Sequence, residues 1–371
     1  MSSYLINGNG KQELSLAIKK VIRHAKKYIK ACNFLFQDKD IIQLLKMATQ
    51  RGVAVFIISN IRLNDYREGD DENSQDSTLP NLNDLKDLGC HVHLLKELHA
   101  KFIIGDGGEP DGEEGIIMSA NFSSNSIGKN TETGVFVYED DLEELEYIFE
   151  KLYLSSDVTD ISRSGDRNTL SKSYKAPEID LNKYASSDVR FTIASKEIDN
   201  NLKGFHIHTI YDSVLNIIKT AQQHLFLVSW HFNSLNNLPG FLTAIKDAKD
   251  RGVNVYVYSN MMGASKSLNS SKKEIRILSD MGCKVFGDNN NHSKCVLNEK
   301  EGILFTANID GYRGMLNGFE VGCMLTKMQR SAAYSHIMSL ISIAKNKMAN
   351  GTNNHNKNKN KNNINHGKNR R

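Results

Sequence analysis

An internal duplication constrains the fold of this 371-residue chain more than any other feature of the sequence. Short landmarks in the first half recur in the same order in the second half, and the offset between copies drifts only from 200 to 187 residues. The matched landmarks are Arg51-Gly52-Val53 with Arg251-Gly252-Val253, Ser59-Asn60 with Ser259-Asn260, Leu88-Gly89-Cys90 with Met281-Gly282-Cys283, His99-Ala100-Lys101 with His292-Ser293-Lys294, Ser119-Ala120-Asn121 with Thr306-Ala307-Asn308, and Glu132-Thr133-Gly134 with Glu320-Val321-Gly322. Two copies of one unit predict two similar domains.

Within each copy, helical and strand patterns alternate. Residues 12–30 have apolar side chains at helical spacing, and the run VAVFIIS at 53–59 is typical of a buried strand. The second copy repeats the pattern, with a helix expected at 208–223 and the strand VNVYVYS beginning at 253. This alternation predicts an α/β protein with two tandem α/β domains, whose mixed, mostly parallel sheets are flanked by helices.

Composition suggests the domain boundaries. We expect an N-terminal domain at 1–154, a polar linker at 155–200, a C-terminal domain at 201–349 and a disordered Asn/Lys tail at 350–371. Residues 351–371 carry six basic side chains and no acidic one, whereas the rest of the chain has 41 basic against 43 acidic residues. Charge outside the tail therefore gives no argument for a polyanionic partner.

The cysteines and the apolar runs indicate the compartment. The five cysteines are odd in number and form no C-x-x-C pair, so we interpret them as small buried hydrophobic residues. The N-terminal stretch has no apolar signal region, and no run approaches the roughly 20 apolar residues that span a bilayer. We expect a cytoplasmic protein without integral membrane association.

Four polar residue types recur at the ends of predicted strands in each copy. His99 and Lys101 lie two residues apart at a strand entry and so share a face, Asn121 ends the next strand, and Glu132 opens a third. The second copy repeats the set as His292, Lys294, Asn308 and Glu320. Each copy thus offers an imidazole, a fixed cation, an amide and a carboxylate.

This combination suits attack on a phosphodiester. A lysine and an amide can stabilise the charge that develops on the non-bridging oxygens. One imidazole can attack phosphorus, and a second, protonated imidazole can donate a proton to the leaving alkoxide. A carboxylate on the far ring nitrogen fixes each tautomer. Since each copy supplies one histidine, the two halves must face each other, and a monomer is sufficient to build the site.

The repeated pattern H-x-K-x4-D, then a small residue-x-Asn, then Glu, resembles the phospholipase D superfamily over about 330 residues. The resemblance implies two domains related by a pseudo-two-fold axis, an active site in the cleft between them, a phosphohistidine intermediate, and no metal or cofactor. It also implies the following roles: His99 as nucleophile, His292 as general acid, Lys101, Lys294, Asn121 and Asn308 as phosphate ligands, and Glu132 and Glu320 as carboxylates that orient the imidazoles across the interface.

Some positions depart from the family pattern. Copy one keeps the aspartate as Asp106, whereas copy two has Glu299, and we expect this position to be structural. Met118 and Phe305 stand where the family usually has glycine, which predicts a narrower phosphate pocket.

Three further residues are candidates for supporting roles. Ser119 and Thr306 precede the two asparagines as the small residues of the motif, and we expect them to support the site. Trp230 follows the first strand of the second half, where it either contacts substrate or packs in the core. His206 and His208 alternate like a metal pair, but no partner is spaced to complete a site, so we predict no metal.

The substrate class follows from the local resemblance. The stretches SANFSSNSIGKNTETGV and HAKFIIGD resemble the nuclease-like bacterial branch, which includes proteins of phage restriction and defence. We therefore expect a nuclease on DNA or RNA, with nucleic acid as the partner and a helicase or ATPase partner protein left open. The alternatives are a phospholipid hydrolase or transferase, either phospholipase D or cardiolipin synthase-like, and a catalytically inactive nucleic-acid-binding module.

Overall fold

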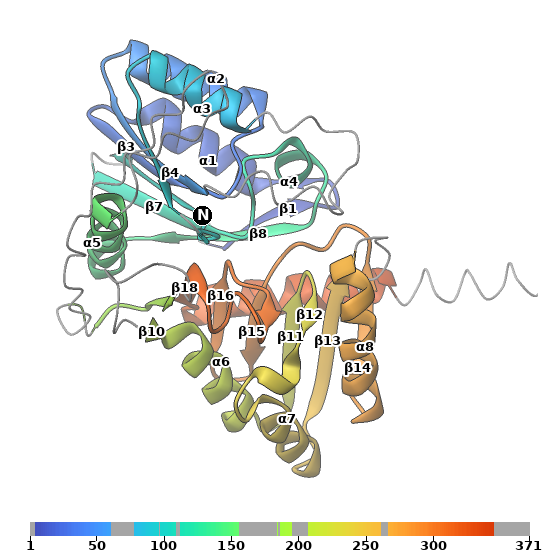
Figure 1. Cartoon of the computed structure of the whole chain (residues 1–371). Helices are drawn as coiled ribbons and strands as arrows, with labels where there is room; N and C mark the ends of the chain where they lie inside the picture. The colour runs from blue at the N-terminus through green and yellow to red at the C-terminus, as the bar shows by residue number, and fades with distance from the viewer. Residues whose placement is uncertain are drawn as a thin grey trace, which may run out of the picture.

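The computed structural model describes residues 4–60, 78–95, 97–108, 112–155, 184, 186–194, 207–260 and 266–344. The predicted tail at 350–371 and most of the predicted linker at 155–200 lie outside these residues. The described chain forms two eight-stranded sheets, each covered by helices, and the two halves face each other (Figure 1). This confirms the expected α/β class with two pseudo-symmetric domains.

The first sheet has the strand order β2-β1-β8-β7-β6-β3-β4-β5. Only the pairs β3–β4 and β4–β5 are parallel among its described strands. Its strands are β1 (Tyr4–Gly8), β2 (Lys11–Gln12), β3 (Tyr28–Cys32), β4 (Ala54–Asn60), β5 (His91–Leu95), β6 (Phe102–Gly108), β7 (Gly112–Met118) and β8 (Glu132–Val137). Its helices are α1 (Glu13–His24), α2 (Lys39–Gln50), α3 (Thr78–Asp87), α4 (Ser124–Gly128) and α5 (Glu139–Ser155).

The second sheet repeats this topology in the order β10-β9-β18-β16-β15-β11-β13-β14. Its strands are β9 (Val189–Ala194), β10 (Ile207–His208), β11 (His224–Ser229), β13 (Asn254–Asn260), β14 (Lys284–Asp288), β15 (Cys295–Asn298), β16 (Gly302–Phe305) and β18 (Gly318–Met324), and β12 (Phe232–Asn233) pairs with β17 (Ile309–Asp310) apart from it. The helices are α6 (Thr209–Thr220), η2 (Leu235–Asn237), α7 (Phe241–Asp250) and α8 (Lys266–Asp280), followed by helical residues 327–344.

Two details of the sequence-based prediction are wrong. The sheets are mixed but mainly antiparallel, because β6, β7 and β8 follow one another through a hairpin and the short α4 rather than through long crossover helices. Strand β9 lies inside the predicted linker and pairs with β18 in the second sheet. Its alternating VRFTIA pattern is short and follows a long polar stretch, which hid it in the sequence.

The repeated Arg-Gly-Val landmark is structural in both halves. Gly52 and Gly252 end α2 and α7 with φ of +87° and +84°, a conformation that favours glycine. The guanidinium of Arg51 donates to the carbonyl of Ile22 at 3.1 Å, and that of Arg251 donates to the carbonyl of Ala221 at 3.1 Å. Each landmark thus ties the end of one helix to the helix before it.

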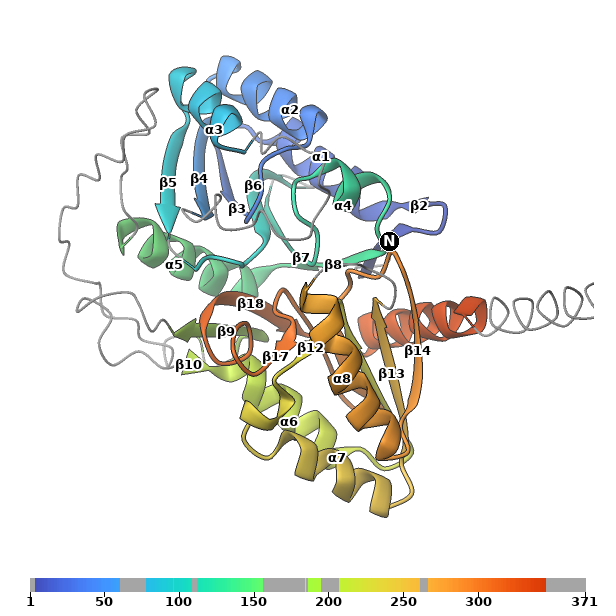
Figure 2. The ribbon, with the colours of Figure 1, turned by 45° about the vertical axis from the view of Figure 1, so that its right-hand side comes forward.

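Three hydrophobic clusters form the core, and one of them is shared by the two halves. Apolar side chains of α1 and α2 cover the outer face of the first sheet, and those of α6 and α7 cover the outer face of the second. The two sheets face each other in Figure 2. A third cluster lies between them and combines Phe102 and Phe149 of the first half with Phe226 and Phe319 of the second. The relative position of the halves is therefore fixed by apolar packing. No helix among the described residues is long and apolar enough to cross a membrane.

Candidate active site

The two His-x-Lys segments are anchored by backbone hydrogen bonds that cross between the halves. The His99 N–H donates to the carbonyl of Phe319 at 2.9 Å, and the His292 N–H donates to the carbonyl of Thr131 at 3.0 Å. The residue after each of these carbonyls is a glutamate, Glu320 or Glu132. Each histidine is therefore brought beside the carboxylate of the opposite half.

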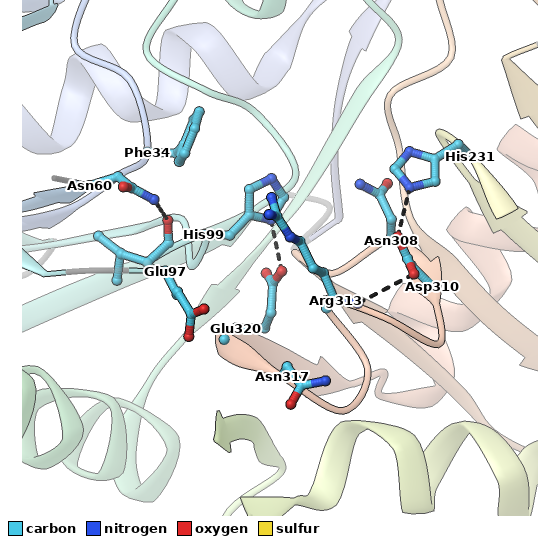
Figure 3. A pocket seen from close by; sticks show the side chains of 13 residues that line it. Phe34, Asn60, Glu97, His99, His231, Asn308, Asp310, Arg313, Asn317 and Glu320 are labelled. Atoms are coloured by element: carbon cyan, nitrogen blue, oxygen red, sulfur yellow. Dashed lines mark hydrogen bonds and ion pairs between the residues drawn. The ribbon is translucent and has the colours of Figure 1, made fainter. Parts of the chain in front are cut away.

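Both imidazoles contact these carboxylates through Nδ1. His99 Nδ1 lies 2.8 Å from Glu320 Oε1 (Figure 3), and His292 Nδ1 lies 2.8 Å from Glu132 Oε1. The carboxylates are almost completely buried. A carboxylate on Nδ1 keeps the ring hydrogen there, so that Nε2 of the neutral ring carries the lone pair.

Hydroxyl groups hold the two carboxylates in place. Ser119 Oγ donates to Glu132 Oε2, and Thr306 Oγ1 donates to Glu320 Oε2. Each hydroxyl oxygen in turn accepts a backbone N–H at 3.0 Å, from Thr133 in the first half and from Val321 in the second. Ser119 and Thr306 thus act on the histidines through the glutamates.

The two lysines lie completely buried beneath the histidines. Lys101 Nζ donates to the carbonyl of His99 at 2.7 Å, and Lys294 Nζ donates to the carbonyl of His292 at 2.6 Å. Burial lowers the pKa of Lys101 to about 8, although the charges of Glu320 and Glu132 oppose the shift. The lysine ammonium groups provide fixed positive charge close to both imidazoles.

Burial and charge also set the protonation of the histidines. Burial lowers the pKa of His99 to about 4, with Glu320 opposing and Lys101 adding to the effect. The pKa of His292 is lowered for the same reasons, with Glu132 opposing the effect of burial. Both imidazoles are therefore neutral in the free protein near pH 7.

The two glutamates titrate below the usual glutamate range. Burial alone would raise the pKa of Glu132, but His292 and Lys294 more than offset this and lower it. The pKa of Glu320 is lowered in the same way by His99 and Lys101 against the effect of burial. Both carboxylates remain ionised at neutral pH.

The two asparagines lie at the ends of their strands with unused polar atoms. The Oδ1 atoms of Asn121 and Asn308 are buried, and neither has a hydrogen-bond partner among the described residues. Such an atom carries a desolvation penalty unless a ligand satisfies the amide. The side-chain amides are therefore suited to bind a polar group at this position.

A cavity of about 170 Å³ opens beside His99. Its lining residues come from both halves, with Phe34 and Asn60 on one side and Asn308, Arg313 and Glu320 on the other (Figure 3). His231 and Asp310 complete the wall of the second half, where His231 Nε2 lies 3.3 Å from Asp310 Oδ2. The corresponding positions of the first half are Leu35 and Ser123, so this pair has no symmetric counterpart.

Asp106 and Glu299 lie away from this cavity, at the far ends of their strands. The Asp106 carboxylate accepts from the backbone N–H groups of Lys26, Lys27 and Tyr28 at 2.8 to 3.3 Å. Glu299 binds the backbone of Gln222 and Gln223 in the same way. Both carboxylates hold the turn that leads from the first helix into the next strand of their half.

The prediction of a narrower phosphate pocket from Met118 and Phe305 is wrong. Both side chains are completely buried and pack in the outer-face cores of their own halves. Neighbouring residues of a strand point to opposite faces, so these side chains point away from the interface.

An aromatic ring packs against each catalytic candidate histidine. Trp230 lies 5.7 Å from His292 and Phe34 lies 5.5 Å from His99, measured between ring centroids. Strand pairing places Phe34 and Trp230 at equivalent positions, because Tyr28 pairs with Ala54 as His224 pairs with Asn254. Sequence reasoning identified Trp230 but missed Phe34, Asp310 and Arg313. The signal for Phe34 was its position after β3, which matches that of Trp230 after β11.

Comparison with known proteins identifies a similar domain and similar folds. Residues 18–153 match the family model described as "Cardiolipin synthase, PLD-like domain". Curated protein sequences gave no match. Phosphatidylserine synthase of Haemophilus influenzae superposes with a TM-score of 0.57 at 15% identity, covering 91% of this chain and 86% of that one.

Two other solved structures share the fold along most of this chain. Yeast tyrosyl-DNA phosphodiesterase superposes with a TM-score of 0.50 at 12% identity, covering 88% of each chain. Polyphosphate kinase of Porphyromonas gingivalis superposes with a TM-score of 0.53 at 11% identity over 92% of this chain, which spans only 50% of that kinase. The chain thus shares its duplicated fold with these solved structures, and within its first half residues 18–153 are similar to a phospholipase D-like domain.

Proposed function

We propose that this protein is a metal-independent phosphodiesterase that cleaves nucleic acid through a phosphohistidine on His99. Members of the phospholipase D superfamily, which the repeated motif resembles, are phosphodiesterases and phosphotransferases. The observation that carries the proposal is the exchange of carboxylates, in which Glu320 orients His99 and Glu132 orients His292 above two buried lysines. This arrangement supplies two imidazoles with Nε2 available for reaction.

In the first step, the lone pair of His99 Nε2 attacks phosphorus and the P–O bond to the leaving alcohol breaks. His292, protonated in the complex with the anionic diester, gives its proton to the leaving oxygen. Lys101 and Lys294, with the amides of Asn121 and Asn308, bind the non-bridging oxygens. In the second step, His292 accepts a proton from water, the water oxygen attacks phosphorus, and the P–N bond breaks to release the phosphomonoester.

Two observations support His99 as the nucleophile, beyond the family similarity. The described cavity opens beside His99, where substrate can approach its ring. Burial lowers the pKa of His99 to about 4, so nearly all of the His99 imidazole is neutral at pH 7, as nucleophilic attack requires.

The charged and amide side chains among the residues that line the cavity support a nucleic-acid substrate. Phe34 and Leu98 are the only large apolar residues of its described lining, and most of the others carry polar or charged groups. Of the exposed large apolar side chains among the described residues, only Tyr312 adjoins this lining in sequence, whereas Leu16, Met47 and Leu88 lie on the outer helices and the turn after α3. An enzyme that acts on lipid would need apolar surface for acyl chains at the site.

The test is cleavage of labelled single- and double-stranded DNA and of RNA in the presence of EDTA. We expect cutting by the wild type and its loss in His99→Ala and His292→Ala, with His91→Ala as an exposed-histidine control outside the site. Rapid denaturation at alkaline pH, where the P–N bond of phosphohistidine is stable, followed by mass spectrometry should locate a phosphoryl adduct on the peptide that contains His99.

The same preparation should be incubated with phospholipid vesicles, because the description of the matched family names a lipid enzyme, cardiolipin synthase. Release of head group from the vesicles, without nucleic-acid cleavage, would replace the proposal with a phospholipid hydrolase or transferase. Nucleic-acid binding that is unchanged by His99→Ala, without cleavage of any substrate, would instead indicate an inactive binding module.

A further inference from the structure

Close to the site, the two halves differ in the segment that follows each asparagine. In the first half, this segment forms the short helix α4, which Ser123 begins. In the second half, residues 311–317 form a loop that contributes Arg313 and Asn317 to the cavity beside His99. The neighbouring Tyr312 is 57% exposed, which is unusual for a large aromatic side chain beside a polar cavity.

The loop is built to hold this conformation. Asp310 Oδ1 accepts the backbone N–H of Tyr312 at 2.7 Å and that of Arg313 at 3.3 Å. Asn317 Nδ2 donates to the carbonyl of Tyr312 at 2.9 Å. Gly314 has φ of +77°, a conformation that favours glycine. Asp310 is itself held by the buried His231, at 3.3 Å.

Polar groups of the cavity wall remain available to a ligand. The Arg313 guanidinium has no carboxylate partner among the described residues, and it lies 5.9 Å from the centroid of the Tyr312 ring. Nδ1 of His231, whose side chain is nine-tenths buried, has no hydrogen-bond partner within the described part of the chain. Figure 3 shows the Arg313 side chain extending from the loop toward His99.

We propose that Tyr312 and Arg313 form a nucleotide subsite beside His99, in which Arg313 binds the phosphate next to the scissile one and Tyr312 stacks on an unpaired base. This inference rests on the proposed nuclease function and extends it to single-stranded substrates. An arginine binds phosphate through a planar fork of donors, and an exposed aromatic ring stacks on any base whose face is free.

The subsite predicts a preference for single strands. In a duplex, each base is covered on both faces by its neighbours, so Tyr312 could stack on it only after unpairing. The loop occurs only in the second half, so the subsite lies on one side of the symmetric centre. The nucleotide that binds to Tyr312 and Arg313 therefore lies in one fixed direction from His99 and His292.

The experiment compares oligothymidylate with methyl p-nitrophenyl phosphate, a diester that has no neighbouring phosphate and no base. The measure is the ratio of kcat/KM for the oligonucleotide to kcat/KM for the small diester, which corrects for general damage to the site. We expect Tyr312→Ala to lower this ratio roughly tenfold and Tyr312→Phe to retain it. Tyr138→Ala, at another half-exposed tyrosine, is the matched control.

Arg313 is tested through the salt dependence of binding. Arg313→Gln should reduce the slope of log affinity for oligothymidylate against log salt concentration by about 0.7, the contribution of one single-strand phosphate contact. Arg313→Lys should keep the slope, and the exposed Arg276→Gln on α8 should leave it unchanged. An unchanged ratio in Tyr312→Ala, or an unchanged slope in Arg313→Gln, would overturn the inference.

Failure of the two proposals can be told apart. If the wild type cleaves neither diester, the nuclease proposal fails, but the anisotropy of labelled oligothymidylate still reports binding to the subsite. Loss of this binding in Tyr312→Ala, with retention in Tyr138→Ala, would support the subsite. Equal affinity for single strands and duplexes, or tighter binding to anionic vesicles than to oligothymidylate, would reject it.

Discussion

Glu320 accepts the Nδ1 hydrogen of His99 at 2.8 Å, although 221 residues separate them in the chain. The reciprocal pair, His292 and Glu132, is separated by 160 residues. Backbone hydrogen bonds from each histidine to the residue before the opposite glutamate set this geometry. Neither half can therefore orient its own imidazole, and each depends on the strand register of the other.

The different roles proposed for the two histidines predict different responses to the leaving group. Nitrophenolate needs no proton to leave, whereas an alkoxide does. His292→Ala should therefore lose about 10²- to 10⁴-fold in kcat on dinucleotides but much less on methyl p-nitrophenyl phosphate. His99→Ala should lose activity on both substrates. The reverse pattern, with His99→Ala spared on the nitrophenyl ester, would exchange the two roles.

The activity should have a bell-shaped pH profile in kcat/KM for the nitrophenyl ester. Activity should rise with pH as His99 loses its proton through about 4, and fall as Lys101 loses its charge through about 8. Arginine keeps its charge to much higher pH, so Lys101→Arg, if thermal melting shows it folded, should lose the alkaline limb. An alkaline limb at the same pH in this variant would assign it to another group.

Asp106 should contribute to stability and not to chemistry. Its carboxylate accepts three backbone N–H groups far from His99. Asp106→Ala should lower the free energy of unfolding by roughly 1 to 2 kcal/mol, as the loss of a helix cap does, and leave kcat nearly unchanged at a temperature where the variant is folded. Urea unfolding and steady-state kinetics on the same sample separate the two effects. A large fall in kcat with unchanged stability would contradict this interpretation.

His336 should make the protein less stable in acid. Burial, with a smaller effect from Lys11, lowers its pKa to about 4 in the folded state, whereas the unfolded value is near 6.5. The unfolded chain binds more protons between these values, so stability falls as pH drops from about 6.5 to about 4. His336→Gln should reduce the difference in unfolding free energy between pH 7 and pH 5 by roughly 1 kcal/mol in urea titrations. If His91→Gln reduces the difference in unfolding free energy between pH 7 and pH 5 as much as His336→Gln does, the effect is not specific to His336.

Much of the fold was predictable because the duplication repeats both apolar periodicity and turn residues. Strands such as β4 and β13 are runs of β-branched and aromatic residues that follow a glycine-terminated helix and end in a Ser-Asn pair, so local pattern alone identifies them. Pairing direction was not predictable in this way. The antiparallel order of β6, β7 and β8 depends on short connections, and β9 has too few residues for its period to stand out.

The candidate site was also predictable only in part. The histidines, lysines, asparagines and glutamates recur in both copies, and repetition made them visible. His231, Asp310 and Arg313 occur in only one copy, so the repeat gave no signal for them, and only the fold brings them to one cavity. Residues that break the symmetry are the ones that a search for repeats passes over.

The apolar cluster between the sheets makes each half of the chain dependent on the other for burial of its inner face. Phe102, Phe149, Phe226 and Phe319 are buried where the two halves meet, so an isolated half would leave a large apolar face open to water. Once the halves have assembled, this apolar packing holds them together. Two halves that are expressed separately should therefore reconstitute the molecule in a concentration-dependent way.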